Sequence, residues 1–163
     1  MPSDRQSILF VCLGNICRSP LAESVFRHLV REEGVEHRFE IDSAGTSGYH
    51  VGDPPDARSV ATARARGVEV RGTSRQLDAA DLRRFDYVIV MDRENLANVE
   101  RLVGSAGGST RVHLLREWDP ERGSDDVPDP YYGGPRGFDD VHDIVERSCR
   151  ALLAHLLGEL EEE

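Results

Sequence analysis

Apolar and polar positions along the chain change their spacing several times, and each change predicts a new element. Residues 6–12 form an apolar run without alternation, which is typical of a central strand covered on both faces. A turn at Gly14 and Asn15 follows. A helix ending near Gly34 is then predicted by apolar residues at helical spacing: Leu21, Ala22, Val25, Phe26, Leu29 and Val30. The chain thus begins with a predicted strand, a tight loop and a helix.

The same alternation of strand and helix continues along the chain. We expect strands at residues 38–44, 87–91 and 111–115, and helices at residues 56–66, 93–103 and 138–160. Gly67 and Gly104 follow two of these helices and are expected to end them. This order predicts an α/β fold of three layers, in which a central four-stranded, parallel, twisted sheet carries helices on both faces. A length of 163 residues fits a single domain over residues 1–163.

Two segments rich in Gly, Pro and Asp separate these elements, at residues 47–55 and 119–137. The second is unusually long for a connection, and long connections in compact domains are often functional. We therefore expect this second segment to contribute to a site.

Composition narrows the chemistry that the chain can perform. All twenty basic residues are Arg, which excludes reactions that need a lysine amine, such as Schiff-base, PLP and P-loop chemistry. Thirty acidic residues give a net charge of -10, which argues against a nucleic-acid surface. No apolar run is long enough to span a bilayer or to serve as a signal region, so we expect no membrane partner and a cytoplasmic location.

The cysteines and histidines indicate free thiols rather than a metal centre. Cys12, Cys17 and Cys149 are too few for a disulfide framework, which favours a reducing compartment. Neither the cysteines nor the six histidines have the paired spacing of a metal site, so no metal and no cofactor is expected. The thiols are then free to react.

The loop from Cys12 to Pro20 joins the predicted central strand to the first helix. Open α/β sheets bind ligands at this position, where backbone N–H groups and the positive end of a helix attract anions. Gly14 permits a bend, Asn15 tolerates left-handed geometry, and Arg18 can hold two oxygens of a phosphate. The same charges favour the thiolate of Cys12, which makes this residue a candidate nucleophile.

A less specific interpretation of the loop has to be weighed. A cysteine at the end of a buried strand is usually inert packing, and an arginine at a helix start is usually solvated. Here Cys12 and Arg18 are separated by five residues that include Gly-Asn, and a strand precedes them. This conjunction favours a phosphate-binding loop.

Residues 9–20, with the sequence LFVCLGNICRSP, resemble the signature of the low-molecular-weight protein-tyrosine phosphatases. The resemblance extends along nearly the whole chain through Ser43-Ala44-Gly45-Thr46, Val51-Gly52, Asp56, Arg58, Arg75-Gln76, Met91-Asp92, Asn95 and Asp129-Pro130-Tyr131-Tyr132. It implies the phosphotyrosine phosphatase I-like, Rossmann-like version of the predicted fold. It also implies a hydrolase that acts on tyrosine-phosphorylated proteins without a metal or cofactor.

The resemblance also implies roles for individual residues. Cys12 would be the nucleophile that forms a phosphocysteine, Arg18 would bind phosphate, and Asp129 would be the general acid and base. The implied phosphate-binding loop is Leu13, Gly14, Asn15, Ile16, Cys17, Arg18 and Ser19, with supporting hydrogen bonds from Asn15, Ser19 and Ser43. The implied walls of the substrate cleft are Tyr49, His50, Tyr131 and Tyr132. Two roles stay open for Cys17: a redox partner that protects oxidised Cys12 as a disulfide, which the resemblance favours, or packing alone.

One position departs from the family pattern. The family commonly has His where this chain has Gly72, within the network that supports the phosphate loop, and Thr73 or a water is a candidate substitute. Without this histidine, we expect the rigidity of the implied phosphate-binding loop to depend on other residues. At another position, relatives that act on phosphoarginine tend to carry a small polar residue, whereas this chain has Ile16, which favours phosphotyrosine.

The leading hypothesis is a phosphotyrosine protein phosphatase, and three further functions stay open. A phosphoarginine phosphatase would use the same loop. A thiol-dependent arsenate reductase shares the fold and the first loop, but it needs cysteines near the middle of the chain, and none lies between Cys17 and Cys149. A non-catalytic phosphate or phosphopeptide sensor would only bind, and the presence of Cys12 and Asp129 argues against it.

Overall fold

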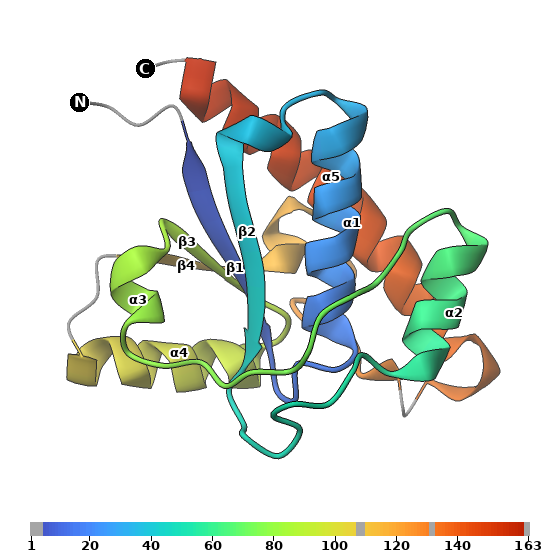
Figure 1. Ribbon diagram of the computed structural model, residues 1–163, viewed down its shortest axis with the longest axis horizontal. Coiled ribbons are helices and arrows are strands. Elements are labelled where there is room, and N and C mark those ends of the chain that lie inside the picture. Colours follow the sequence, from blue (N-terminus) through green and yellow to red (C-terminus); the bar gives the residue numbers. More distant parts are fainter. Residues whose placement is uncertain (1–4, 107–109, 131–132, 162–163) are drawn as a thin grey trace.

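A four-stranded parallel sheet lies at the centre of the fold in the computed structural model, which describes residues 5–106, 110–130 and 133–161 (Figure 1). The strands are β1 (Gln6–Cys12), β2 (Phe39–Gly45), β3 (Tyr87–Val90) and β4 (Arg111–Leu114). Their order is β2-β1-β3-β4, and each neighbouring pair is parallel. The prediction of a four-stranded parallel sheet with the first strand inside it is confirmed.

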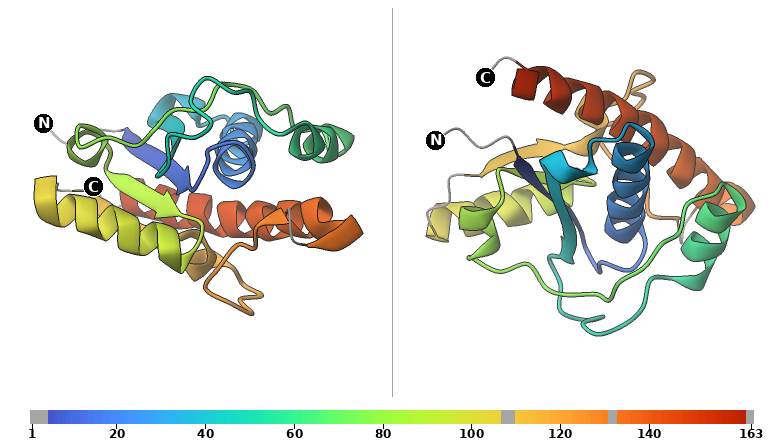
Figure 2. Two further views of the ribbon diagram at one scale, coloured as in Figure 1. Left: turned by 90° about the horizontal axis from the view of Figure 1, so that it is seen from below. Right: turned by 45° about the horizontal axis from the view of Figure 1, so that its top comes forward.

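Helices cover both faces of this sheet (Figure 2). One face carries α1 (Arg18–Glu32) and α5 (Gly137–Glu161), with α2 (Ala57–Ala65) beside them. The other face carries α4 (Arg93–Ala106) and the single turn α3 (Asp81–Arg84). Three short 3-10 helices complete the described elements: η1 (Glu36–Arg38), η2 (Leu115–Trp118) and η4 (Gly134–Arg136). The three predicted layers are confirmed.

The apolar sequence of β1 follows from its position between these two helical layers. Ile8 and Phe10 belong to the core cluster formed with α1 and α5, whereas Leu9 and Val11 belong to the cluster formed with α3 and α4. All four side chains are 0% exposed. Because successive side chains of a strand point to opposite faces, a strand buried on both faces has no polar alternation.

Two helices differ from the sequence-based expectation. α4 continues through Gly104 to Ala106, because an apolar side that includes Leu96 and Val99 packs on the sheet and outweighs the roughly 1 kcal/mol that glycine costs inside a helix. α3 was not predicted, since one turn is too short to establish a helical period. Gly34 and Gly67 have positive φ values of 71° and 81° just after α1 and α2, as expected of helix ends.

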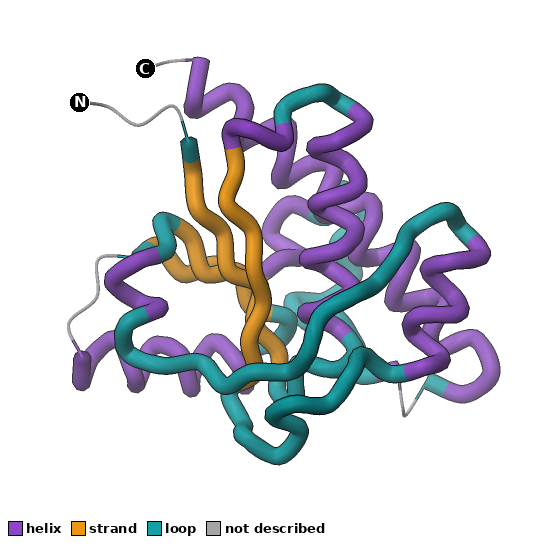
Figure 3. The backbone as a smooth tube through the Cα atoms, viewed as in Figure 1, coloured by secondary structure: helices purple, strands orange, loops and turns teal. Residues whose placement is uncertain are grey.

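The loops that follow the strands gather at the carboxyl edge of the sheet (Figure 3). In parallel α/β sheets this edge is the usual ligand-binding position. In the part of the chain that the structure describes, no helix combines the length and the apolar character needed to cross a membrane.

His142 on α5 predicts an acid-sensitive core. It is 1% exposed, and no hydrogen-bond partner is described for Nδ1. Burial, followed by the positive charge of Arg66, lowers the pKa of His142 below its ordinary value of 6.5. The unfolded chain therefore takes up this proton at a higher pH than the folded protein does. The contribution to the free energy of unfolding is complete above about pH 6.5 and is lost as the pH falls toward the folded pKa.

Urea unfolding at about pH 7.5 and about pH 5.5 measures this effect. We expect the loss of stability on acidification to be smaller in His142→Leu than in the wild type. His37→Gln, which changes an exposed histidine, should keep the wild-type loss. An equal loss in the wild type and His142→Leu would contradict the prediction.

Candidate functional site

Residues 13–17 form the loop between the end of β1 and the start of α1. Asn15, at the centre of this loop, has a φ of 56°, in the left-handed region that asparagine tolerates. The end of β2 supports the loop, because Ser47 N donates to Leu13 O at 2.9 Å. Gly45 permits this approach, since a Cβ at that position would lie 2.7 Å from Leu13 O.

The start of α1 is suited to hold an anion. The helix begins at Arg18, the side chain of Cys17 provides no cap, and the first turn contains no acidic residue. The N–H groups of a first helical turn have no partner within the helix, and they carry the positive end of the helix dipole. A negatively charged ligand can satisfy both features.

Three donor groups converge on the sulfur of Cys12. Asn15 N lies 3.3 Å from Sγ, Ser19 N lies 3.4 Å from it, and Ser19 Oγ lies 3.0 Å from it. The Cys12 residue is 3% exposed. Hydrogen bonds to a sulfur are stronger when it is charged, so these three groups are placed to stabilise negative charge that develops on the sulfur during a reaction.

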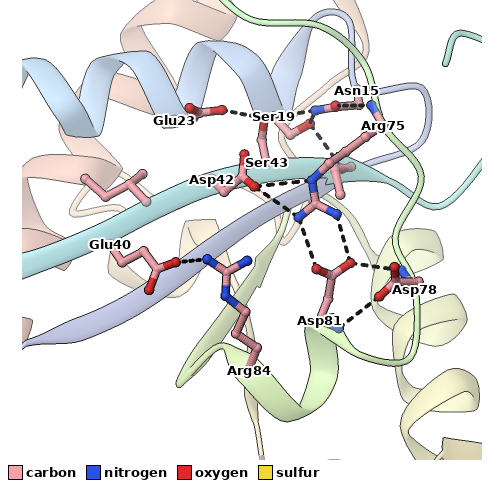
Figure 4. Close-up of polar contacts among 12 residues, drawn as sticks. Asn15, Ser19, Glu23, Glu40, Asp42, Ser43, Arg75, Asp78, Asp81 and Arg84 are labelled. Carbon is pink, nitrogen blue, oxygen red and sulfur yellow. Dashed lines mark hydrogen bonds and ion pairs between the residues drawn. The ribbon is translucent and has the colours of Figure 1, made fainter. Parts of the chain in front are cut away.

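Side chains behind the loop connect these donors to the rest of the fold (Figure 4). Asn15 Nδ2 donates to Ser19 Oγ at 2.8 Å and to Ser43 Oγ at 3.0 Å. Ser43 Oγ in turn donates to Glu23 Oε1 at 2.6 Å. The structure thus brings Asn15, Ser19 and Ser43 together, and Glu23 of α1 extends the network.

Arg18 reaches from the first turn of α1 to the end of β3. Its Nη1 donates to Asp92 Oδ2 at 2.6 Å and to Val127 O at 3.1 Å. Asp92 is fixed in turn, because its Oδ1 accepts a hydrogen bond from Asn95 N at 2.7 Å. Burial opposes the charge of Arg18, but the negative charges of Cys12 and Asp92 outweigh burial and raise its pKa. Arg18 therefore keeps a positive charge beside Cys12.

One cavity of about 160 Å³ collects most of the predicted site residues. It is lined by Cys12, Leu13, Gly14, Ile16, Cys17, Arg18, Ser47, Tyr49, His50 and Asp129. Asn15 and Ser19 contact Cys12, and Ser43 contacts Asn15. A thiol, a guanidinium and a carboxyl group from distant parts of the chain thus share one small cavity.

Asp129 reaches this cavity on a loop that is attached to the sheet. Val127 is 0% exposed and donates its N–H to Met91 O at 2.7 Å. Arg116, which is 6% exposed, donates to Asp126 O at 2.9 Å. These contacts fix the backbone just before Asp129, so the fold determines where the chain carries this residue into the cavity.

Cys17 lines the same cavity but is a different kind of thiol. Burial, followed by the negative charge of Asp56, raises the pKa of Cys17 to about 12. It is therefore protonated at neutral pH and reacts slowly, since the thiolate is the reactive form. The role of Cys17 as a redox partner of Cys12 stays a prediction.

Tyr49 and His50, two of the expected cleft residues, line the cavity. Tyr49 is 94% exposed, so it stands at the mouth of the cavity and is not packed into a wall. His50 Nδ1 lies 3.0 Å from Asp53 Oδ2. Tyr131 and Tyr132, the other two expected cleft residues, lie outside the described residues.

Gly72 faces open space behind the phosphate loop. Its φ is 105°, and no atom lies within 4 Å of the position that a Cβ would occupy. It lines a cavity of about 260 Å³ together with Asn15 and Thr73, and Thr73 is exposed. Two following residues do contact the loop. Ser74 Oγ donates to a loop carbonyl oxygen at 2.9 Å, and Arg75 N donates to Asn15 Oδ1 at 3.0 Å.

Among the described residues, no group of three or more His, Cys, Asp or Glu side chains is arranged to hold a metal ion. The charged groups around the cavity are instead Arg18, Asp129 and the helix end. Together with the donors around Cys12, they make the cavity suited to hold an anion beside a cysteine thiol.

Known proteins resemble the chain over most of its length. The family model for low molecular weight phosphotyrosine protein phosphatase matches residues 7–162. The low molecular weight phosphotyrosine protein phosphatase of Gallus gallus is 42% identical over 149 residues, which cover 91% of this chain and 94% of that protein. The chain belongs to the low molecular weight phosphotyrosine protein phosphatase family and is a hydrolase.

Two solved structures have the same fold. The crystal structure of YfkJ from Bacillus subtilis matches with a TM-score of 0.88 and 39% identity, covering 95% of this chain and 96% of that chain. A Drosophila arginine phosphatase matches with a TM-score of 0.86 and 31% identity, covering 91% and 96%. Because the second of these is an arginine phosphatase, the fold alone does not decide which phosphorylated side chain is the substrate.

Sequence reasoning gave no role to five residues that hold or line the site: Glu23, Ser47, Ser74, Arg75 and Asp92. Asp92 lies two residues after β3, at the same carboxyl edge as the loop that follows β1, and this shared position is a signal that could have found it. Glu23 had no such signal, and Arg75 was only one of the positions that carry the family resemblance, with no role attached to it. Their partners Ser43 and Asn15 lie 20 and 60 residues away in the sequence.

Gly45→Ala tests the close approach between β2 and the loop of residues 13–17. The added methyl group would meet a main-chain oxygen at 2.7 Å, so the backbone must shift. We expect a loss of about 1–3 kcal/mol in the free energy of unfolding and a fall of at least about tenfold in aryl phosphate hydrolysis. Urea unfolding and steady-state kinetics measure the two effects.

Gly158→Ala is the matched control, because nothing lies within 4 Å of that position in α5. It should keep wild-type activity, with equal or higher stability, since alanine is the better helix former. Wild-type kinetics for Gly45→Ala would contradict this account of the loop.

Proposed function

We propose that this protein hydrolyses phosphotyrosine in proteins through a phosphocysteine intermediate. Cys12 is the nucleophile, Arg18 binds the phosphate, and Asp129 is the general acid and base. The observation that carries the proposal is the convergence of three donor groups on Cys12 Sγ, beside a cavity that Arg18 and Asp129 also line. The site thus combines a stabilised thiolate, a cation for a dianion and a group that can deliver a proton.

In the first displacement, Cys12 Sγ forms a bond to phosphorus while the bond from phosphorus to the phenolic oxygen breaks. Asp129 gives its proton to that oxygen, so the leaving group departs as a phenol and not as a phenolate. Arg18 and the N–H groups of the loop stabilise the charge on the phosphoryl oxygens. Loose phosphoryl transfer needs mainly this positioning and charge stabilisation.

In the second displacement, Asp129 accepts a proton from the water whose oxygen attacks phosphorus. The bond from sulfur to phosphorus breaks, inorganic phosphate forms, and Cys12 leaves as a thiolate. Ser19 Oγ lies 3.0 Å from Sγ and can donate to the sulfur as its charge returns. This sequence restores both Cys12 and the proton on Asp129.

The cavity favours an aromatic substrate through Ile16, which lines it and is half-buried. Its side chain offers apolar surface to a ring but no partner for the N–H groups of a guanidinium. Tyr49 adds a second apolar surface at the mouth. Phosphoarginine is the second candidate substrate, because a Drosophila arginine phosphatase shares the fold at a TM-score of 0.86.

Arsenate reduction and phosphate sensing fit the described residues less well than hydrolysis does. Arsenate reduction by a relay of thiols needs a second reactive thiol, but burial raises the pKa of both Cys17 and Cys149. A sensor that only binds phosphate needs no carboxyl group in the cavity, yet Asp129 lines it. The proposed chemistry also needs Cys12 in its reduced form, which favours a cytoplasmic location.

Two substitutions test the assigned roles with an aryl phosphate as substrate. Cys12→Ser should abolish turnover, because an alcohol is not ionised at neutral pH. Asp129→Ala should lower kcat by about 10²–10⁴-fold while the inhibition constant of inorganic phosphate stays close to the wild-type value. Steady-state kinetics measure both. Cys149→Ala and Asp125→Ala are the matched controls and should stay active. Wild-type turnover in Cys12→Ser would refute the nucleophile assignment.

Phosphopeptides of one sequence decide between the candidate substrates. We expect kcat/KM to be highest for phosphotyrosine and much lower for phosphoserine and phosphoarginine, because only the first presents a ring to Ile16. In Ile16→Thr, the preference for phosphotyrosine over phosphoarginine should narrow. A wild-type protein that turns over phosphoarginine faster than phosphotyrosine would select the second candidate.

A further inference from the structure

We propose that Arg75, clamped by Asp81, is a positioning residue for the phosphate loop. The inference rests on the proposed function, because it concerns how Cys12 is kept reactive. Arg75 does not line the cavity that contains Cys12. It acts through Asn15, and the connection runs from α3 to the sulfur through an unbroken series of hydrogen bonds.

The backbone of Arg75 is the point where this series meets the loop. Arg75 N donates to Asn15 Oδ1 at 3.0 Å, and Arg75 O accepts from Gly45 N at 2.9 Å. Leu77 N then donates to Gly45 O at 2.8 Å, and Gln76 forms a parallel bridge with Gly45. Residues 75–77 therefore pair with the end of β2 and hold the N–H group of Arg75 against the loop.

This N–H group sets the direction of every hydrogen bond that follows. A main-chain N–H can only donate, so the oxygen of the Asn15 amide must face it and the Nδ2 group must face the two serines. Nδ2 then donates to the hydroxyl oxygens of Ser19 and Ser43. Each serine hydroxyl must therefore donate its own hydrogen bond to an acceptor other than Asn15. The Ser43 hydroxyl donates to Glu23.

The Ser19 hydroxyl has two acceptors within reach. Cys12 Sγ lies 3.0 Å from Ser19 Oγ, and Ala44 O lies 3.4 Å from it. The sulfur is nearer, and a hydrogen bond to a charged thiolate is stronger than one to a neutral carbonyl. The orientation imposed by Arg75 N thus ends in an O–H group that donates to the proposed nucleophile.

The guanidinium of Arg75 holds this backbone segment in place (Figure 4). Nη1 and Nη2 each donate to one oxygen of Asp81, at 3.0 and 3.1 Å, which is the paired geometry that fixes both groups. Nε donates to Asp42 Oδ2 at 3.2 Å, and Asp42 Oδ1 accepts from Ser43 N at 2.8 Å. Arg75 is therefore connected to Asn15 through its backbone N–H group and to Ser43 through Asp42.

Asp81 provides a rigid partner for this clamp. Its side chain is 7% exposed. Asp78 N donates to Asp81 Oδ2 at 2.9 Å, and Asp81 N donates to Asp78 Oδ1 at 3.0 Å. Burial works against the charge of Arg75, but the hydrogen bonds that Arg75 donates to Asp81 and the negative charge of Asp42 outweigh it and raise the pKa of Arg75. Arg75 and Asp81 thus form a charged, partly buried ion pair, which holds the two side chains in one relative orientation.

Gly72 makes the clamp more important in this chain. Its position behind the loop is open, and no side chain from there can hold Asn15. Support from this segment comes instead from Ser74 and from the Arg75 backbone.

Arg75→Lys and Asp81→Asn test the clamp, because each removes the paired geometry with little change in size. We expect kcat for an aryl phosphate to fall by about tenfold to a hundredfold, as is typical when supporting groups are lost, with a smaller change in KM. We also expect a change in the pH profile of enzyme inactivation by iodoacetate. The pH at which the inactivation rate is half of its maximum should be higher in both variants than in the wild type. Iodoacetate alkylates Cys12 without any turnover of substrate. Slower inactivation in the presence of inorganic phosphate shows that the alkylated thiol lies in the cavity.

Arg84→Ala is the matched control, because Arg84 pairs with Glu40 on a neighbouring surface and has no contact with the loop in Figure 4. It should keep wild-type kinetics and the wild-type inactivation profile. Arg75→Lys in an Asn15→Ala background should cost little beyond Asn15→Ala alone, since both changes break the same series.

The proposal is overturned if Arg75→Lys and Asp81→Asn keep the wild-type kcat and inactivation profile. It is also overturned if kcat falls only in proportion to the folded fraction and the inactivation profile stays unchanged, since the clamp would then serve stability alone. Failure of the proposed function gives a different result. In that case the wild-type protein itself does not hydrolyse the aryl phosphate, or Cys12→Ser still does.

Discussion

The sulfur of Cys12 is held by two main-chain N–H groups and one hydroxyl group, and the rest of the site depends on this arrangement. A hydrogen bond to a charged group contributes about 1.5–3 kcal/mol, so the loss of one donor would change the reactivity of the sulfur by a large factor. Main-chain donors cannot reorient like side chains. Their direction is fixed by the path of the loop. The reactivity of the sulfur therefore depends on the backbone geometry of the loop.

Elements far apart in the sequence fix that path. β1 carries Cys12 to the edge of the sheet, and its side chains are buried against helices on both faces. β2 approaches closely at Gly45, and the adjoining segment orients Asn15 through the backbone of Arg75. On the far side, Arg18 is attached to Asp92 at the end of β3. The position of Arg18 and the support of the sulfur are thus both tied to the sheet.

A feature of this protein could be predicted from the sequence when the residues that form it lie close together along the chain. The strands and long helices were predictable because their apolar spacing repeats within one segment, whereas the single turn Asp81–Arg84 has too few residues to establish a period. The loop from Cys12 to Arg18 was predictable because its chemistry lies in seven consecutive positions. The contact between Arg75 and Asn15 joins positions 60 residues apart, and only the fold brings them together.

Carbon-13 NMR of protein labelled at the cysteine Cβ atoms tests the central claim most directly, because the Cβ shift reports the ionisation of each sulfur. The chain has three cysteines, so three resonances are expected, and the Cys12→Ser spectrum assigns one of them. The account predicts that at neutral pH Cys12 has the shift of a thiolate while Cys17 and Cys149 have the shift of thiols. A thiol shift for all three cysteines at neutral pH would contradict it.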